Sequence, residues 1–308
     1  MTIDLRRAAR WHRPLMIFVS VMAVLAAVCA VGILVDSRVL TGAPIWLKPF
    51  KFAVSFVLYG ATLAWMLTLL PRRSRAAEWA ATVVVAMAVV EMVVIVAQVV
   101  RGQTSHFNGT SALNSALFSV MGAAIMVLFL AHLLIGIVLL IRRIPDRAAA
   151  TAVGWGLGLS LLGMLAAIPM VLPMQEPGID GISGAHSVGV IDGGAGLPVV
   201  GWSTTGGDLR IGHFVGLHAL QALPILAILL SRFATRLDER TRVRLLVVAG
   251  AAYGVLTVLL TWQALRGQPL LRPDAVTLAA VAALVVTTAT AAGLVLARRR
   301  RPDLALAA

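Results

Sequence analysis

Long apolar runs separated by short polar segments dominate this chain. A bilayer is crossed by about 20 consecutive apolar residues, and eight runs reach that length. Only segments that satisfy their own backbone hydrogen bonds are stable in lipid, so each run is predicted to be a transmembrane helix. The predicted spans are 14–35, 50–70, 79–100, 115–141, 149–173, 211–233, 244–265 and 275–297.

The predicted fold is a single all-α integral membrane domain over residues 1–308, a bundle of about eight transmembrane helices. Of the 26 Lys and Arg residues, 19 lie at the two termini and in every second connecting segment. Because cytoplasmic segments of membrane proteins carry an excess of Lys and Arg, both termini are predicted to be cytoplasmic. The net charge of +13 is therefore interpreted as membrane orientation and not as nucleic-acid binding.

The composition agrees with a membrane protein, since 60% of the residues are hydrophobic and 13% are charged. Arg far outnumbers Lys, and Ala, Val and Leu are abundant, which is typical of a high-GC bacterial genome. We expect a multi-pass protein of the bacterial cytoplasmic (inner) membrane, in contact with the lipid bilayer. Cys29 is the sole cysteine, so the chain forms no internal disulfide and no thiolate metal cluster. The first span is predicted to be an uncleaved anchor.

One connecting segment, residues 174–210, is much longer than the others and lies on the predicted outer side. Its glycines and prolines predict turns and no regular structure. Trp202 and His186 favour a packed lid over a loose tether. Within the fifth span, the spacing of Gly154 and Gly158 predicts close helix packing.

Ionisable groups inside a span are costly and mark either a function or a buried pair. Glu91 is predicted to lie near the middle of the bilayer, with Gln98 on the same helix face. His132 and His218 also fall in the middle third of their spans. Glu91, His132 and His218 meet if the third, fourth and sixth spans are neighbours.

The sixth span carries further polar residues at its start. His213 lies five residues before His218, so the two imidazoles point to different sides of the helix and do not form a zinc pair. Gln221, three residues after His218, shares its face. In the segment before this span, Asp208 and Arg210 are predicted to cluster with His213 at the mouth of a pocket. The alternative is that Asp208 caps the helix.

The second span contributes a polar stripe along one helix face, formed by Lys51, Ser55, Tyr59 and Thr62. In lipid that face is expected to point into the protein. A simpler interpretation is that Lys48 and Lys51 extend to the lipid headgroups.

Three blocks, 48–52, 91–108 and 201–221, resemble a family of uncharacterised bacterial multi-pass membrane proteins. They contain Lys48-Pro-Phe-Lys-Phe, Ser105-His-Phe-Asn and Gly207-Asp-Leu-Arg-Ile-Gly-His. The resemblance covers roughly residues 44–221. It implies a shared site on the outer side and no particular chemistry.

The polar groups predict an outward-facing pocket between the second, third, fourth and sixth spans. The favoured function is binding or proton-coupled transport of a small polar solute or ion. The predicted ligand-binding residues are Lys51, Glu91, Gln98, His106, Asn108, Asp208, Arg210, His213, His218 and Gln221.

Other functions remain open. His132 and His218 suggest a membrane oxidoreductase with haem b or another metal centre. His106, Asp208 and His213 suggest an outward-facing enzyme that acts on a lipid or envelope precursor. The polar residues also fit an assembly subunit in which they only pair with one another. The sequence decides neither whether the chain is an enzyme nor its partners or oligomeric state.

Overall fold

The computed structural model describes residues 11–172 and 181–298. The predicted basic clusters at residues 6–10 and 299–301, and the first part of the predicted long segment, lie outside these ranges. The described part contains eight helices that are long and apolar enough to cross a membrane, as the hydrophobic pattern predicted.

The elements are α1 (Arg13–Val35), β1 (Val39–Leu40), β2 (Ala43–Pro44), α2 (Leu47–Leu67), α3 (Arg75–Arg101), α4 (Ala112–Arg142), α5 (Arg147–Leu165), α6 (Ile168–Val171), β3 (Ser187–Val188), β4 (Gly207–Asp208), α7 (Leu209–Phe233), α8 (Glu239–Leu265) and α9 (Ala275–Ala297).

Short polar side chains define where most of the long helices begin. A Ser or Asp oxygen accepts a hydrogen bond from a backbone N–H of the first turn, which otherwise has no partner within the helix. At the other end of α3, Gly102 adopts a left-handed conformation with φ of 68° and ends the helix. The capping residues are Ser74, Ser111, Asp146, Asp208, Asp238 and Asp274.

Two helix bounds differ from the prediction in ways that matter for the site. α3 begins at Arg75, four residues before the predicted span. Glu91 is therefore about 24 Å from that start and about 15 Å from Arg101 at 1.5 Å per residue, and it is not at the middle of its helix. The predicted span 149–173 is broken, because Pro169 has no N–H to donate to the carbonyl of Leu165, where α5 ends.

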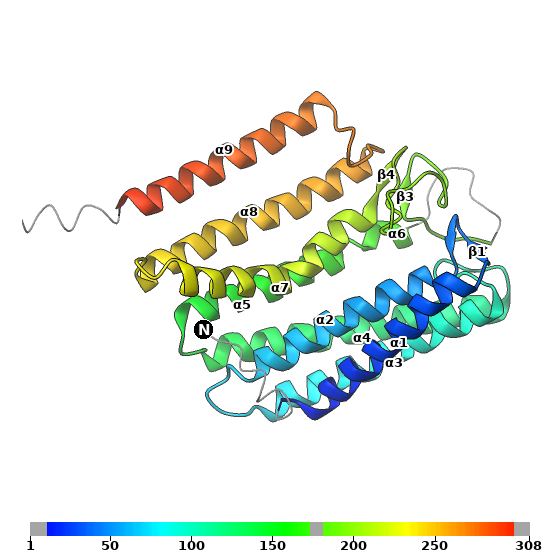
Figure 1. The fold of residues 1–308 in the computed structure, drawn as a ribbon, viewed down its shortest axis with the longest axis horizontal. Helices are drawn as coiled ribbons and strands as arrows, with labels where there is room; N and C mark the ends of the chain where they lie inside the picture. Colours follow the sequence, from blue (N-terminus) through cyan, green and yellow to red (C-terminus); the bar gives the residue numbers. More distant parts are fainter. Residues whose placement is uncertain (1–10, 173–180, 299–308) are drawn as a thin grey trace, which may run out of the picture.

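Successive long helices run in opposite directions, so the connecting segments gather at two ends of the bundle (Figure 1). We call one the loop end, formed by residues 36–46, 102–111, 181–208 and 266–274. We call the other the arginine end, formed by residues 68–74, 143–146 and 234–238.

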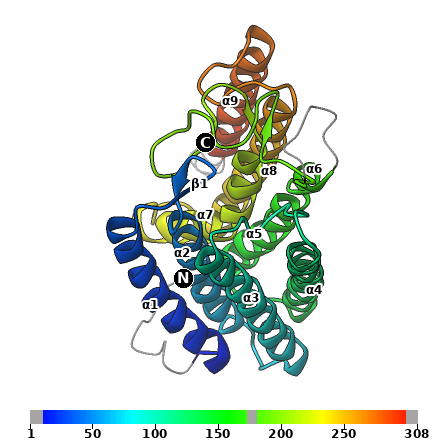
Figure 2. The ribbon, with the colours of Figure 1, turned by 90° about the vertical axis from the view of Figure 1, so that its right-hand side faces the viewer.

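The helices form two groups, α1 to α4 and α5 with α7 to α9, which lie one beside the other (Figures 1 and 2). Contacts of α4 with α5 and of α2 with α7 join the groups. α9 contacts mainly α8 and contributes almost no buried surface.

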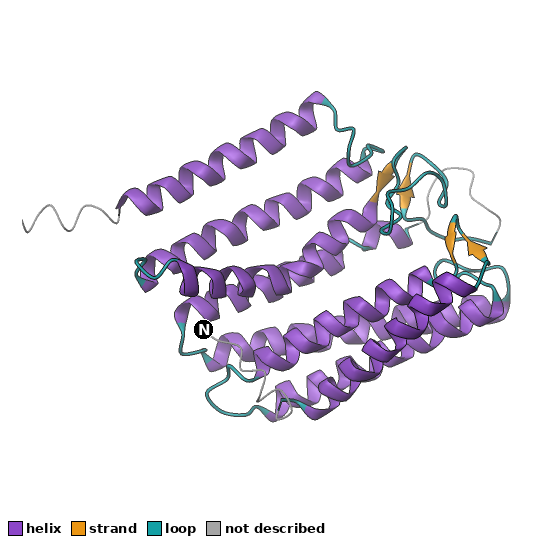
Figure 3. Cartoon of the chain, in the orientation of Figure 1, coloured by secondary structure: helices purple, strands orange, loops and turns teal. Residues whose placement is uncertain are grey.

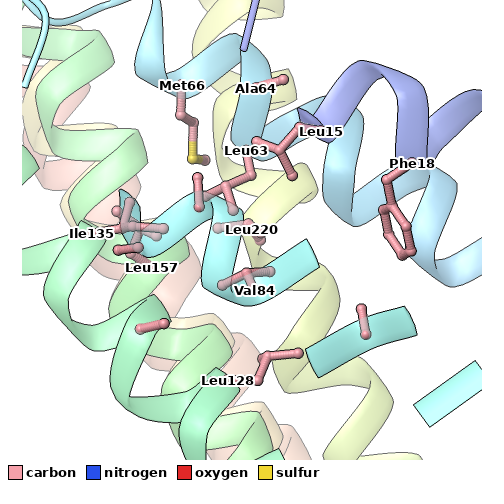
Figure 4. Packing of buried hydrophobic residues seen from close by; sticks show 14 of the residues in the cluster. Leu15, Phe18, Leu63, Ala64, Met66, Val84, Leu128, Ile135, Leu157 and Leu220 are labelled. Carbon is pink, nitrogen blue, oxygen red and sulfur yellow. The ribbon is translucent and has the colours of Figure 1, made fainter. Parts of the chain in front are cut away.

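The main hydrophobic core lies mostly within α1 to α4 and extends to α5 and α7. Figure 4 shows Leu63 of α2, Ile135 of α4, Leu157 of α5 and Leu220 of α7 in this core. The side chains of Leu63, Ile135 and Leu220 are completely buried. The core joins α2, α4, α5 and α7, which carry Lys48, His132, Ser160 and His213 respectively.

A glycine contact sets the close approach of α5 and α7. A Cβ on Gly163 would collide with the backbone of Gly216 and Leu217, and one on Gly156 would lie 3.2 Å from the carbonyl oxygen of Ala219. The predicted glycine pair was wrong at Gly158, because a Cβ there meets no described atom within 4 Å. Spacing alone did not reveal which face of α5 meets α7.

Residues 181–208, which we call the lid, cover part of the loop end with short strands and turns (Figure 3). β3 pairs with β4 in antiparallel register, Ser187 with Asp208. Backbone hydrogen bonds from Gly109 N–H to the Gly181 carbonyl, 2.6 Å, and from Ser183 N–H to the Phe107 carbonyl, 2.9 Å, attach the lid to the segment between α3 and α4. The lid is therefore packed, as predicted.

Candidate functional site

Glu91 and His106 meet at the loop end of the first helix group. The Glu91 side chain is almost completely buried, with a relative exposure of 1%. Its Oε1 lies 3.6 Å from Nε2 of His106. Its second oxygen, Oε2, is buried without any hydrogen-bond partner. A buried carboxyl oxygen in this state is costly, on the order of 1–3 kcal/mol or more.

A polar network positions the segment that carries His106. Gln98 donates to Oδ1 of Asn114, 3.1 Å, and Arg101 donates to the same oxygen, 3.0 Å. Asn108 donates to the carbonyl of Thr104, 2.9 Å. The predicted residues Gln98 and Asn108 are therefore engaged in holding the segment between α3 and α4.

The lid contributes a second imidazole to the loop end. Oδ2 of Asp192 lies 2.6 Å from Nδ1 of His186, and the same carboxylate accepts the backbone N–H groups of His186 and Ser187 at 2.9 and 2.8 Å. These bonds hold the pKa of Asp192 far below its ordinary value of 3.8, although burial opposes the shift. Burial lowers the pKa of His186 below 6.5, which favours the neutral ring.

A third imidazole comes from α7. Nδ1 of His213 lies 2.7 Å from the carbonyl oxygen of Gly163 on α5. This contact is possible because the glycines described above let the two backbones approach closely. The sequence predicted His213 as a site residue, and the structure fixes its ring between α5 and α7.

Electrostatic proximity links these groups to one another. Burial lowers the pKa of His106 well below 6.5, and the Lys48 ammonium lowers it further, as do His186 and His213 in their protonated forms. Lys48 also lies within electrostatic range of Glu91. We call Lys48, Glu91, His106, His186 and His213 the loop-end site.

Lys48 is the cation of this site. Its side chain is only partly exposed. Among the residues that the structure describes, it has electrostatic neighbours and no hydrogen bond or ion pair. By contrast, Nζ of Lys51 donates to the carbonyl of Val200 in the lid, 3.0 Å. Lys51, which the sequence predicted as a ligand contact, therefore anchors the lid.

Asp208 and Arg210 also fasten the lid. Asp208 caps α7 and accepts the backbone N–H of Ser203, 2.8 Å, and Arg210 forms an ion pair with it. Nη2 of Arg210 reaches the Gly201 carbonyl, 2.6 Å. Asp208 is 1% exposed, so its carboxylate is committed to these contacts. This geometry does not support the predicted acid–base cluster of Asp208 with His106 and His213.

The deeper histidines do not join the loop-end site. Nδ1 of His132 lies 2.8 Å from the Tyr59 hydroxyl, and Nε2 lies 2.8 Å from the Ser160 hydroxyl. His218 contacts Gln221, 3.3 Å between Nδ1 and Oε1. No described hydrogen bond or ion pair connects Glu91, His132 and His218, and α3 and α7 are not among the main contacting helices, so the condition on which the three were expected to meet is not fulfilled. Helix depth alone could not supply their rotation.

This arrangement does not fit haem between His132 and His218. A haem ligand must offer one imidazole nitrogen to iron. Both nitrogens of His132 face hydroxyl groups of the protein, and its ring is completely buried. In the described ranges, no three His, Cys, Asp or Glu side chains are arranged to hold a metal ion.

A cavity of about 620 Å³ lies at the arginine end, between α1, α2 and α3. Its polar groups have partners: Arg73 lies 3.9 Å from Glu78, and Nε2 of His12 lies 3.4 Å from the Thr82 hydroxyl. The described lining contains no buried polar atom without a partner. The loop-end site is therefore the stronger candidate.

Comparison with protein-family models, curated proteins and solved structures gives no match for this chain. The resemblance to uncharacterised bacterial membrane proteins stays a prediction, and the site is interpreted from its geometry alone.

Sequence reasoning missed parts of this site. It gave a headgroup contact as one interpretation of Lys48 and left this residue out of the ligand-binding set. It treated His186 as a packing residue, and it did not consider Asp192. A periodic pattern marks residues on one helix face, whereas His186 and Asp192 lie in an irregular lid. The one available signal was the rarity of lysine, since Lys48 and Lys51 are the only two in the chain.

Proposed function

We propose that this protein is a membrane receptor or binding protein for a small polar solute, which it holds in the loop-end site. The Oε2 atom of Glu91, buried and without a partner, carries the proposal. Native proteins pair nearly all of their buried polar atoms, and an unpaired one calls for an explanation such as a ligand or an ordered water. A ligand that donates a hydrogen bond to Oε2 supplies the missing partner.

The surroundings of Glu91 support this proposal. Lys48 adds a positive charge near the carboxylate. Aromatic rings line the same region: Phe52 lies 5.8 Å from the His106 ring, and Phe107 lies 5.0 Å from the His186 ring, measured between centroids. Small-molecule sites typically combine apolar walls with a few polar groups that fix the orientation.

The packing below the site favours binding over transport. Met66, Ile95, Ile135 and Leu220 belong to the core and are fully buried. A solute that moved from the loop end to the arginine end would have to separate these side chains. The predicted proton-coupled transport therefore needs a second conformation, whereas binding does not.

We further propose that the loop end faces outward from a bacterial inner membrane. The segment between α4 and α5 and the segment between α7 and α8, together with the adjoining helix ends, are rich in arginine. Both belong to the arginine end. Segments with excess Arg remain on the cytoplasmic side during insertion. The ligand would then reach the site from outside the cell.

A binding experiment tests the proposal. Purified protein in detergent is screened by thermal shift against three classes of solute: carboxylates and phosphates, amines, and amino acids. At least one class is expected to raise the melting temperature of the wild type, because a ligand that binds only the folded state stabilises it. Lys48→Met should abolish that shift.

Arg272→Met serves as the matched control. It also removes a cation from the loop end, but Arg272 is exposed and is not part of the site. Its ligand-induced shift should equal that of the wild type. Solute-induced shifts that are the same in Lys48→Met and the wild type would contradict the proposal.

A further inference from the structure

The hydrogen-bond partners of two imidazoles fix their tautomers. Nδ1 of His213 faces the Gly163 carbonyl, which can only accept, so this nitrogen carries the hydrogen. Nδ1 of His186 faces the Asp192 carboxylate, so it also carries the hydrogen. In each neutral ring the hydrogen sits on Nδ1, and Nε2 therefore offers a lone pair.

Neither of these Nε2 atoms is used by the protein. Within residues 11–172 and 181–298, no hydrogen bond reaches Nε2 of His186 or of His213. His106 differs, because its Nδ1 lies 3.0 Å from the Ser105 hydroxyl and its Nε2 faces Glu91. The site therefore presents two imidazole acceptors, together with the partnerless Oε2 of Glu91.

The donors of the site are few by comparison. Lys48 supplies the cationic donor of the loop-end site. Its ammonium makes no hydrogen bond to any residue that the structure describes. Lys48 and Glu91 bring one basic and one acidic group to the site, while the Asp192 carboxylate is engaged with His186 and Ser187. A complementary ligand must donate hydrogen bonds to these acceptors and offer an acid group to Lys48.

We propose that the ligand is an amino-acid-like zwitterion. Its primary ammonium donates to Oε2 of Glu91 and to Nε2 of His186 and His213, and its acid group accepts from Lys48. A primary ammonium has three N–H donors, and the site offers three acceptors for them. This inference rests on the proposed function and specifies its ligand.

Other ligand classes match these groups less well. A phosphate or simple carboxylate would satisfy Lys48 but would leave three acceptors unpaired and add a negative charge near Glu91. A quaternary ammonium carries the right charge but has no N–H to donate. A lone amine would leave Lys48 without a partner. Each of these ligands leaves part of the site unsatisfied, which costs binding free energy.

The test uses a set of probes that separate these features. Glycine, β-alanine and γ-aminobutyrate are zwitterions with increasing separation between the charges. Butyrate, butylamine, glycine betaine, inorganic phosphate and zinc chloride each lack one required feature. Binding to purified protein is measured by isothermal titration calorimetry at pH 7.5.

We expect at least one of the three zwitterions to bind, and at least tenfold more tightly than every other probe. Lys48→Met and Glu91→Gln should each weaken that binding tenfold or more, and His213→Phe should weaken it as well. His218→Gln is the control for His213→Phe, since His218 is on the same helix outside the site, and its affinity should stay within twofold of the wild type.

Two further results would overturn the inference. If phosphate, butyrate, butylamine, betaine or zinc binds more tightly than the zwitterions and depends on Lys48 or Glu91, the ligand class is wrong while the proposed binding function stands. If no probe binds, and both Lys48→Met and Glu91→Gln melt well below the wild type, the two residues are structural, and both the inference and the proposed function fail.

Discussion

At the scale of single residues, His132 deep in the bundle and Glu91 near the loop end differ in how their buried polar atoms are paired. His132 is completely buried, and both of its nitrogens face hydroxyl groups, of Tyr59 and Ser160. Glu91 is 1% exposed, and one of its oxygens has no partner. The first arrangement is what stability requires. The second is better explained by a ligand.

Ser160→Ala should destabilise the protein because it leaves Nε2 of His132 buried and unpaired. The expected loss is about 1–3 kcal/mol in the free energy of unfolding, measured in mixed detergent micelles by denaturant titration. Ser119→Ala is the control, since the Ser119 hydroxyl bonds only the carbonyl of Ser115 on an exposed face. If both variants unfold alike, the His132 contacts do not stabilise the fold.

The lid and loop histidines predict a stability that depends on pH. Burial lowers the pKa of His106 and of His186 below the ordinary value of 6.5. As pH falls through 6.5, the unfolded chain takes up protons that the folded protein does not bind, so acid favours unfolding. The melting temperature should therefore fall between pH 7.5 and pH 5.5.

His186→Gln tests the origin of this dependence, because it removes one of the histidines whose pKa is lowered. Its melting temperature should fall less steeply over the same pH range than that of the wild type. A wild-type melting temperature that stays constant or rises towards pH 5.5 would show that the loop histidines are protonated in the folded protein.

At the scale of elements, the contact of α5 with α7 determines where His213 lies. Gly163 and Gly216 lie face to face, and the carbonyl of Gly163 accepts the His213 hydrogen bond, 2.7 Å. Small residues at a helix crossing let two backbones approach closely in a membrane. The close crossing of α5 and α7 and the position of His213 therefore depend on the same pair of glycines.

Gly163→Ala should destabilise the protein by about 1–3 kcal/mol, because the new Cβ would collide with the α7 backbone. Gly158→Ala, in the same helix, is the matched control. Its Cβ meets no described atom within 4 Å, so it should leave stability unchanged or raise it by up to ~1 kcal/mol through helix propensity. If the melting temperatures of Gly163→Ala and Gly158→Ala both shift in the same direction, this account of the helix crossing is contradicted.

Sequence predicts elements better than it predicts their neighbours. The apolar runs predicted eight long helices, and Asp208 offered a visible cap for α7. Caps and hydrophobic length are local properties of the chain. The break at Leu165 was also local, since Pro169 follows four residues later. By contrast, the Gly163 contact depends on how α5 and α7 are rotated, which hydropathy does not specify.

At the scale of the whole molecule, two helix groups lie one beside the other (Figure 1). A hydrophobic core extends from α1 to α4 into α5 and α7, and the polar site lies near the loop end. The lid belongs to that same end. Because the arginine-rich segments lie at the opposite end, the positive-inside rule supports the proposal that the ligand arrives from outside the cell.

Cysteine labelling tests this orientation. Cys29 is buried and is replaced by Ala to give a background without cysteine. In that background, Ala195→Cys in the lid should react in intact cells with a membrane-impermeant maleimide, whereas Thr235→Cys at the arginine end should react only after lysis. Both positions are exposed. The reverse labelling pattern would show that the bundle has the opposite orientation.

The candidate site was predictable only in part. Glu91 and His213 stand out as polar residues near or within apolar runs, and His106 lies in a short polar segment. His186 and Asp192 join them only because the lid attaches to the segment between α3 and α4, whereas Lys48 joins them from the start of α2. The non-local contacts of the lid, such as Ser183 with Phe107, have no counterpart in sequence periodicity.

The central claim is that the carboxylate of Glu91 binds a ligand and does not stabilise the ligand-free protein. The most direct test is the melting temperature of ligand-free Glu91→Gln, with Glu78→Gln at the start of the same helix as the control. We predict that Glu91→Gln melts at or above the wild-type temperature, because it removes a buried charge that has no cationic partner within 4 Å among the described residues. A loss of stability on the order of 3–5 kcal/mol, as expected when a buried ion pair is broken, would contradict the account.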